Sequence, residues 1–128
     1  MTTTTRPALP KVLTRLAFAV AVIVQLLALY WPRVDLPGDG VPGTDKAVHV
    51  LIFATVMATG LLAGIPGRWL ALGLAAHAVL SELIQHLVLP ERSGDPLDLV
   101  ADLAGIALGW YVITYVRRHS TARSPQSP

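Results

Sequence analysis

The chain has no cysteine and few charged or aromatic side chains. The absence of cysteine excludes disulfides, thiolate metal sites and a cysteine nucleophile. Charged residues make up 14% of the 128 residues, well below the roughly 25% usual in soluble domains. Gly-rich phosphate loops and CxxC, HExxH and GxSxG motifs are also absent, so the common signatures of soluble enzymes are missing.

Apolar residues dominate instead, at 53% of the chain with a mean hydropathy of +0.57. They gather in four segments, each long enough to cross a bilayer as a helix: about residues 12–31, 45–65, 69–89 and 96–116. We therefore predict an all-α integral membrane protein, an antiparallel bundle of four transmembrane helices in one domain, 12–116. Residues 1–11 are expected to form a flexible tail and residues 117–128 a disordered basic tail.

Residue types at the segment ends predict where two helices begin. Thr44 is a plausible N-cap, and Asp45 after it suits the positive end of a helix dipole. Pro96 occupies a favoured first helical position, with Asp95 as the N-cap.

The positive charges predict the orientation, because Lys and Arg are enriched in cytoplasmic connections. Seven lie in the two terminal flanks and the second connection: Arg6, Lys11, Arg15, Arg68, Arg117, Arg118 and Arg123. Three lie in the other two connections: Arg33, Lys46 and Arg92. Both termini are therefore expected to be cytoplasmic. The pI near 9.4 reflects these flanks, so no nucleic-acid partner is expected.

Three segments carry polar residues toward the same predicted outer end. These are Asp45, Lys46 and His49 in the second, Glu82, Gln85 and His86 in the third, and Asp98 and Asp102 in the fourth. At about 1.5 Å of rise per residue, His49, Glu82 and Asp102 fall within roughly 5–12 Å of the outer helix ends. Such a cluster can share protons, hold a divalent cation, or clamp a phosphate through Lys46 and Arg92.

Less specific interpretations stand beside these. Asp45, Asp95 and Asp98 can be helix caps or first-turn acids. Glu82 and Asp102 lie deeper, where a charge costs about 2.5–3.5 kcal/mol on insertion scales for an Asp, Lys or Arg at a helix centre, so a functional role is favoured over a structural ion pair. The spacing requires no metal, and no cofactor is expected.

Other residues indicate packing. His77 and Gln25 are predicted to form hydrogen bonds between helices. Two GxxxG spacings, Gly60/Gly64 and Gly105/Gly109, predict close helix approach inside the bundle first and homo-oligomer contacts second.

The ordered polar elements resemble those of the VanZ-like family, small bacterial membrane proteins named for a teicoplanin-resistance determinant. The first element is Asp-Lys-x-x-His-x-x-x-Phe, from Asp45 to Phe53, and the second is Glu82-x-x-Gln85. The third is an Arg followed by Asp residues and a Gly-containing helix: Arg92, Asp95, Asp98, Asp102 and Gly105. The resemblance covers roughly residues 44–109.

One position departs from the family's pattern, since the place of Asp102 is commonly Asn. A carboxylate there adds a potential charge beside Glu82 and Asp98, which is expected either to alter the protonation of the site or to make it more attractive to a cation. The resemblance implies a four-helix protein of the bacterial plasma membrane and cell envelope, with a role in tolerance to lipoglycopeptides such as teicoplanin.

Three functional hypotheses follow. In the leading one, the cluster engages membrane lipids or a lipid-linked cell-wall precursor: Lys46, Arg92 and His49 meet an anionic group, and Glu82, Asp98 and Asp102 orient those cations or relay a proton. Asp45, Gln85 and Asp95 complete the expected ligand-binding set. In the second, the protein is a membrane-embedded hydrolase or transferase of a lipid-linked substrate, with Glu82 or His49 as general base and Asp98 and Asp102 as further catalytic candidates. In the third, the polar groups serve only structure or docking.

Overall fold

The structure is a computed structural model that describes residues 9–31, 41–89 and 95–121. These residues form four helices and no strand: α1 (Lys11–Tyr30), α2 (Thr44–Leu62), α3 (Gly67–Val88) and α4 (Pro96–Thr121). Each helix is long and apolar enough to cross a membrane. The prediction of an all-helical chain with four such segments is confirmed.

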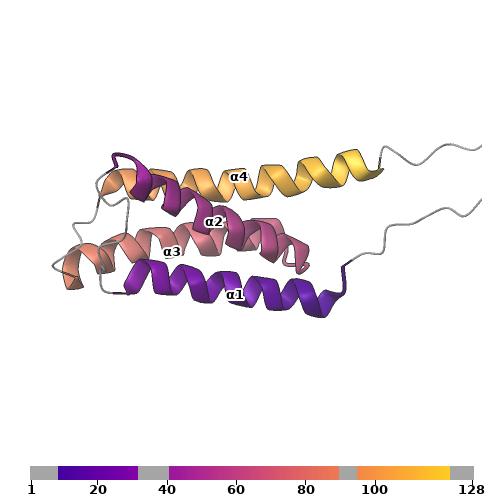
Figure 1. Cartoon of the computed structure of the whole chain (residues 1–128), viewed down its shortest axis with the longest axis horizontal. Coiled ribbons are helices and arrows are strands. Elements are labelled where there is room, and N and C mark those ends of the chain that lie inside the picture. The colour runs from indigo at the N-terminus through magenta and orange to yellow at the C-terminus, as the bar shows by residue number, and fades with distance from the viewer. Residues whose placement is uncertain (1–8, 32–40, 90–94, 122–128) are drawn as a thin grey trace, which may run out of the picture.

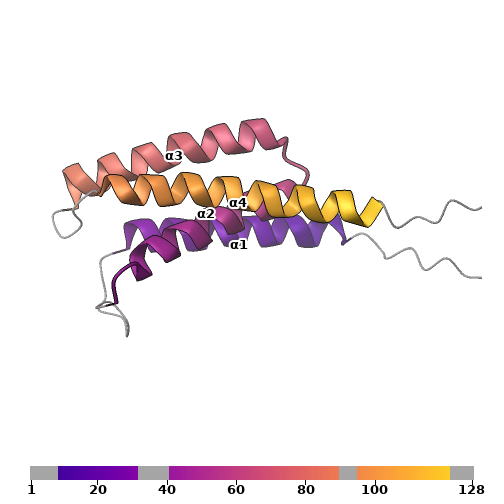
Figure 2. The ribbon, with the colours of Figure 1, turned by 90° about the horizontal axis from the view of Figure 1, so that it is seen from above.

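The helices lie side by side along one axis (Figure 1). α1 and α3 run in one direction and α2 and α4 in the other, so the starts of α2 and α4 lie at the same end as the last turns of α1 and α3. α2 packs against each of the other three helices, most extensively against α4. It runs obliquely, from a start away from α3 to an end beside the start of α3 (Figure 2). α2 is therefore the central helix, in contact with all three others.

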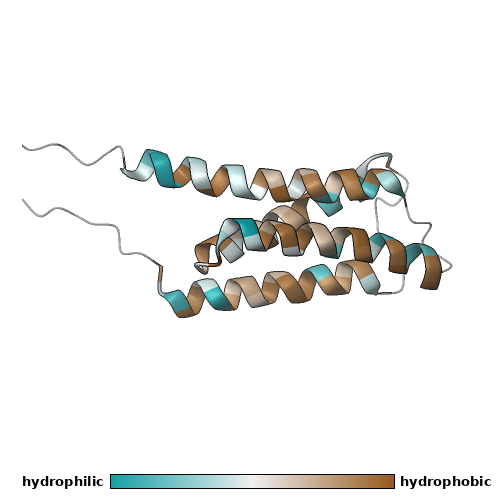
Figure 3. Cartoon of the chain, turned by 180° about the vertical axis from the view of Figure 1, so that it is seen from behind, coloured by the Kyte–Doolittle hydropathy of each residue, from teal (hydrophilic) through white to brown (hydrophobic). Residues whose placement is uncertain are grey.

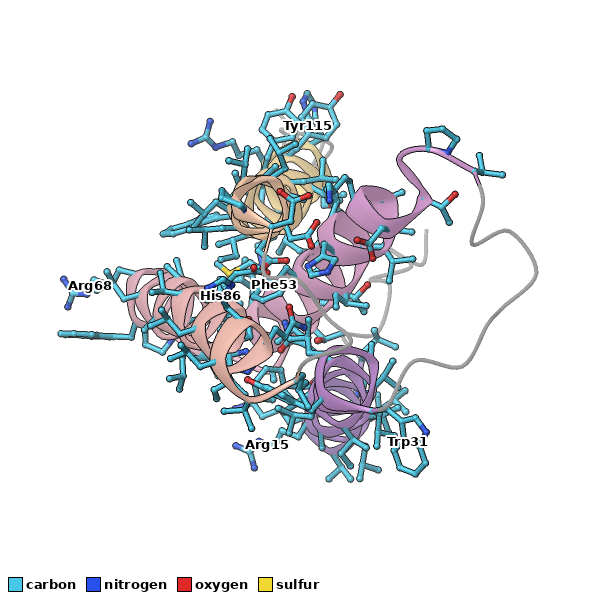
Figure 4. The ribbon with its side chains drawn as sticks, turned by 90° about the vertical axis from the view of Figure 1, so that its left-hand side faces the viewer. Arg15, Trp31, Phe53, Arg68, His86 and Tyr115 are labelled. Carbon is cyan, nitrogen blue, oxygen red and sulfur yellow. The ribbon has the colours of Figure 1, made fainter. Side chains whose placement is uncertain are left out.

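The core centres on α2, where Phe53 and Met57 are fully buried and Val56 is nearly so. Viewed along the helix axes, Phe53 points into the middle of the bundle, whereas Arg15 and Arg68 point away from it (Figure 4). Close van der Waals packing of such side chains holds helices together even where their surroundings are apolar.

Glycines let α4 approach α2 closely. A Cβ on Gly105 would collide with the backbone oxygen of Val50, and one on Gly109 would lie 2.5 Å from the backbone oxygen of Ala54. The predicted packing role of Gly105 and Gly109 inside the bundle is confirmed. Their shared face is occupied by α2, which leaves it closed to a second copy of the chain.

The Gly60/Gly64 pair behaves differently from the prediction. Gly60 packs beneath Leu70 of α3, but Gly64 lies beyond the end of α2, with φ at 92° and no atom within 4 Å of the place its Cβ would take. Gly64 therefore serves the turn into α3, because a left-handed backbone conformation favours glycine. It does not form a packing pair with Gly60.

Apolar residues occupy most positions along the helices (Figure 3), and many of them lie on the outside of the bundle. Large side chains that would be buried in a soluble protein lie outward on every helix, among them Leu16 (58% exposed), Leu51 (62%), Leu72 (62%) and Val100 (61%). An outward apolar surface along all four helices is unlike a soluble monomer, in which apolar patches are small. It suggests a multi-pass membrane protein.

Several helix bounds differ from the prediction. α2 ends at Leu62 and α3 begins at Gly67, which lengthens the turn between them, and α1 begins at Lys11. Thr44 is the first helical residue; the N-cap is Gly43, with φ at 87° and no side-chain cap.

The largest difference is at the end of α4, which continues to Thr121. The expectation of disorder from residue 117 is wrong for residues 117–121. Arg117 Nη2 donates a hydrogen bond to the carbonyl oxygen of Leu61 (2.8 Å), so the last turns of α4 are tied to the end of α2. Residues 1–8 and 122–128, the rest of the two predicted tails, lie outside the described residues.

Candidate functional site

Polar side chains from three helices meet at the end of the bundle where α2 and α4 begin. We call this set the polar cluster: Asp45, Lys46 and His49 of α2, Glu82 of α3, and Asp95, Asp98 and Asp102 before and within α4. The predicted convergence of these residues therefore occurs among the described residues. The cluster forms because α2 and α4 start at one end while α3 finishes there.

Lys46 is the centre of the outer half of the cluster. Its Nζ lies 2.6 Å from Asp95 Oδ2, 2.5 Å from Asp98 Oδ1 and 3.7 Å from Asp45 Oδ2. The ammonium group therefore serves three carboxylates and holds the starts of α2 and α4 together. Because Asp98 is only 6% exposed, its contact with Lys46 is shielded from solvent more than the other two.

Asp95 lies just before α4 and caps it as predicted. Its Oδ1 accepts a hydrogen bond from the backbone N–H of Leu97 (2.9 Å), which satisfies one of the donors that a helix start leaves free. Its other oxygen accepts from Lys46 Nζ. The hydrogen bond from Lys46 is the main cause that lowers the pKa of Asp95, followed by the hydrogen bond from Leu97.

The inner half of the cluster is a buried pair. His49 Nδ1 donates a hydrogen bond to Asp102 Oδ1 (2.7 Å), and neither side chain is accessible, with His49 5% and Asp102 0% exposed. The other ring nitrogen, Nε2, lies 3.9 Å from Asp98 Oδ2. A carboxylate that holds one ring nitrogen fixes the tautomer and orientation of an imidazole and leaves the second nitrogen to face a ligand.

Glu82 approaches the same place from α3. A ligand atom of Glu82, one of His49 and one of Asp102 all lie within 4.8 Å of one another. Glu82 Oε1 and Asp102 Oδ2 are buried and have no hydrogen-bond partner among the described residues. Buried polar atoms in native proteins are nearly always paired, so these two oxygens are candidates for contact with a ligand or an ion.

The packing of a glycine brings His49 and Asp102 together. Gly105 lies one turn after Asp102, and its lack of a side chain lets α4 touch the backbone of α2 at Val50, the residue after His49. The close approach brings Asp102 to hydrogen-bonding distance of His49. The small-residue pattern of α4 and the histidine–aspartate pair are therefore parts of one arrangement.

Of three further predicted residues, two do not join the polar cluster. Gln85 Nε2 donates a hydrogen bond to the carbonyl oxygen of Leu29 (2.9 Å), so Gln85 connects α3 to α1 rather than facing the cluster. His86 is exposed. Arg92 lies outside the described residues.

Other polar contacts join helices away from the cluster. The predicted hydrogen bonding of His77 between helices is confirmed, since its Nε2 shares a hydrogen bond with the hydroxyl of Tyr30 (3.2 Å). The Arg117 contact with Leu61 was not predicted, because a basic residue near a helix end reads as a flank charge. Gln25 is 2% exposed, and its Nε2 has no hydrogen-bond partner among the described residues.

A groove of about 310 Å³ lies between α1, α2 and α3, separate from the polar cluster. Phe18 and Leu70 are among the apolar residues that line it, and Gln25 and His77 supply polar groups. No spacing in the sequence signals this groove, because its walls come from the faces of three helices.

Acidic groups outnumber basic ones in the polar cluster. Lys46 and His49 face five carboxylates, those of Asp45, Glu82, Asp95, Asp98 and Asp102. Coulomb interactions in a region of low dielectric constant favour a cation, a proton or a hydrogen-bond donor at such a place. The cluster is therefore better suited to a positive or donor group than to a bare anion.

Comparisons of the chain with protein-family models, with curated proteins and with solved structures give no match. The resemblance to the VanZ-like family thus stays a prediction that depends on the ordered polar residues.

Proposed function

We propose that this chain is an integral protein of the bacterial plasma membrane whose polar cluster engages the head group of a lipid-linked envelope ligand. In this proposal the four helices form an antiparallel transmembrane bundle with both termini in the cytoplasm, so that the cluster lies toward the outer face. The charge count of the connections supports the orientation, and the apolar outer surface supports the membrane setting.

The observation that carries the proposal is the gathering of buried polar side chains at one end of an otherwise apolar bundle. Asp98, Asp102 and His49 are each at most 6% exposed, although burial of ionisable groups among transmembrane helices is costly and usually marks a functional site. Three different helices contribute to the cluster.

The geometry also refines the ligand. Lys46 is engaged by Asp95 and Asp98, so it is not placed to clamp a phosphate as its sequence context suggests. Hydroxyl and amino groups, which the head group of a cell-wall precursor lipid carries besides its phosphates, match the excess of carboxylates. Glu82 Oε1 and Asp102 Oδ2 are the oxygens available to accept from them.

The proposed cellular role, which depends on the resemblance, is a contribution to tolerance of teicoplanin. The test compares teicoplanin susceptibility of a sensitive bacterium that expresses the wild-type chain, Glu82→Gln, or His86→Gln, at matched membrane abundance. The control changes an exposed side chain on the same helix. We expect the wild type and His86→Gln to raise tolerance equally and Glu82→Gln to lose the effect.

The other outcomes are informative. No change in susceptibility with the wild type would refute the proposed role in that host. Equal tolerance with Glu82→Gln would refute the part assigned to the cluster. Loss of folded Glu82→Gln protein from the membrane would favour the structural hypothesis, in which the cluster holds the helices together.

The His49–Asp102 pair favours a second candidate function, a hydrolase or transferase acting on a lipid-linked substrate. An imidazole oriented by a buried carboxylate can act as a general base through its other nitrogen. The test places the purified chain in nanodiscs that contain a bacterial lipid extract and searches for released head groups by mass spectrometry. Release by the wild type that His49→Gln abolishes would support catalysis, and equal release by both would refute it.

A further inference from the structure

The inner half of the polar cluster has the composition of a divalent-metal site. His49, Glu82 and Asp102 come from α2, α3 and α4, and each offers one ligand atom within 4.8 Å of the other two. Metal–ligand bonds of about 2.0–2.2 Å place two ligands of one ion no more than about 4.4 Å apart. The three ligand atoms therefore need to approach one another by up to about 0.4 Å to share one ion.

A second observation points to a ligand at this place. Asp102 is 0% exposed, and its Oδ2 has no hydrogen-bond partner among the described residues. Glu82 Oε1, from the facing helix, is also buried and has no hydrogen-bond partner among the described residues. Two buried carboxylate oxygens without partners, close to one imidazole, need a positive charge or protons between them.

The lysine of the polar cluster is already engaged. Lys46 Nζ lies within 2.6 Å of both Asp95 and Asp98, so it neutralises the outer half of the cluster. A second candidate set, Asp45, His49 and Asp98, shares Asp98 with this ammonium group and is therefore less suited to a metal. The carboxylates of Glu82 and Asp102 are therefore the ones that still need a positive charge beside them.

We propose that His49, Glu82 and Asp102 bind a divalent transition-metal ion, with Zn²⁺ the best match. Imidazole nitrogen and carboxylate oxygen are ordinary ligands of Zn²⁺, and three protein ligands leave a fourth position for water or a ligand group. Two carboxylates carry the charge that one divalent ion balances. The inference goes beyond the proposed function, because metal binding requires only these three side chains and neither the lipid-linked ligand nor the antibiotic.

The experiment uses the full chain, purified in detergent with an affinity tag that contains no histidine. The protein is stripped with a chelator, titrated with Zn²⁺ by calorimetry, and analysed for bound metal after dialysis. We expect one Zn²⁺ per chain, with binding weakened tenfold or more by Glu82→Gln and by Asp102→Asn, since even residues that only support a ligand commonly change metal affinity about 10–100-fold. His86→Gln is the matched control and should bind as the wild type does.

A second measurement keeps the proposal testable if a variant does not fold. Zn²⁺ should raise the Tm of the wild-type chain by mass action, and X-ray absorption should show only nitrogen and oxygen neighbours. Absence of stoichiometric binding by the wild type, or undiminished binding by folded Glu82→Gln and Asp102→Asn, would overturn the proposal. Binding abolished by Asp98→Asn but not by Glu82→Gln would also overturn it, because the ion would then lie at the other set. None of these failures bears on teicoplanin susceptibility, which is measured separately.

Discussion

Replacement of Gly105 by alanine tests whether close packing of α4 on α2 builds the candidate site. The new Cβ would collide with the backbone oxygen of Val50 and lie 3.0 Å from Phe53 Cβ. Neither group is the far end of a flexible side chain, so the two helices must separate. Separation there lengthens the hydrogen bond between His49 and Asp102, one turn away.

The magnitude follows from two opposing effects. Overpacking of a well-packed core costs about 1–3 kcal/mol, whereas alanine in place of glycine favours a helix by about 1 kcal/mol. Gly73→Ala in α3 is the matched control, because nothing lies within 4 Å of its added Cβ and the propensity gain is the same. We expect Gly105→Ala to be about 1–3 kcal/mol less stable than Gly73→Ala.

The assay is unfolding of both purified variants in mixed micelles, followed by helical circular dichroism. Zn²⁺ affinity of the same samples reports on the site, and we expect it to fall for Gly105→Ala and stay unchanged for Gly73→Ala. Equal stability of the two variants would show that α4 does not contact α2 at Gly105, and the account of how the site is assembled would fail.

Three further predictions concern contacts at the two ends of the bundle. Arg117→Ala should lower the free energy of unfolding by about 1 kcal/mol, because it removes the hydrogen bond to the carbonyl oxygen of Leu61. Arg118→Ala, measured in the same way, is the control. Tyr30→Phe should cost about 1 kcal/mol or less in the same unfolding assay, since it removes the hydroxyl that contacts the half-buried His77 of α3. The Lys46 contact lowers the pKa of Asp95 from its ordinary value of 3.8, so its stabilising effect should be fully present above that value and be lost as the pH falls through the lowered pKa in the folded protein. Wild-type Tm should then decline between pH 5 and 2 more steeply than that of Asp95→Asn, and identical declines would contradict the assignment.

Local patterns predicted much of the fold. Four apolar runs of about twenty residues indicate four helices because a bilayer or a core requires that length, and the capping role of Asp95 follows from its place before Pro96. The extension of α4 to Thr121 could not be predicted. The reason is that Arg117 finds its acceptor on α2, at a residue 56 positions away in the chain.

The candidate site could likewise be predicted only in part from the sequence. Periodicity placed His49, Glu82 and Asp102 at similar depths, since residues three and four apart share a helix face and the rise per residue is constant. It could not distinguish Gln85, one turn from Glu82, whose amide turns to Leu29 of α1.

Length, hydropathy and spacing are local properties, so they are enough to predict which segments are helices and which of them carry ionisable groups toward one end. The partners of these groups can be read only from the tertiary structure. Lys46 forms ion pairs with Asp95 and Asp98, and His49 forms a hydrogen bond with Asp102. Pairing depends on the rotation and closeness of α2 and α4, which are set where the bare backbone of Gly105 meets Val50. Contacts of that kind join residues that are distant in the chain, and no local pattern encodes them.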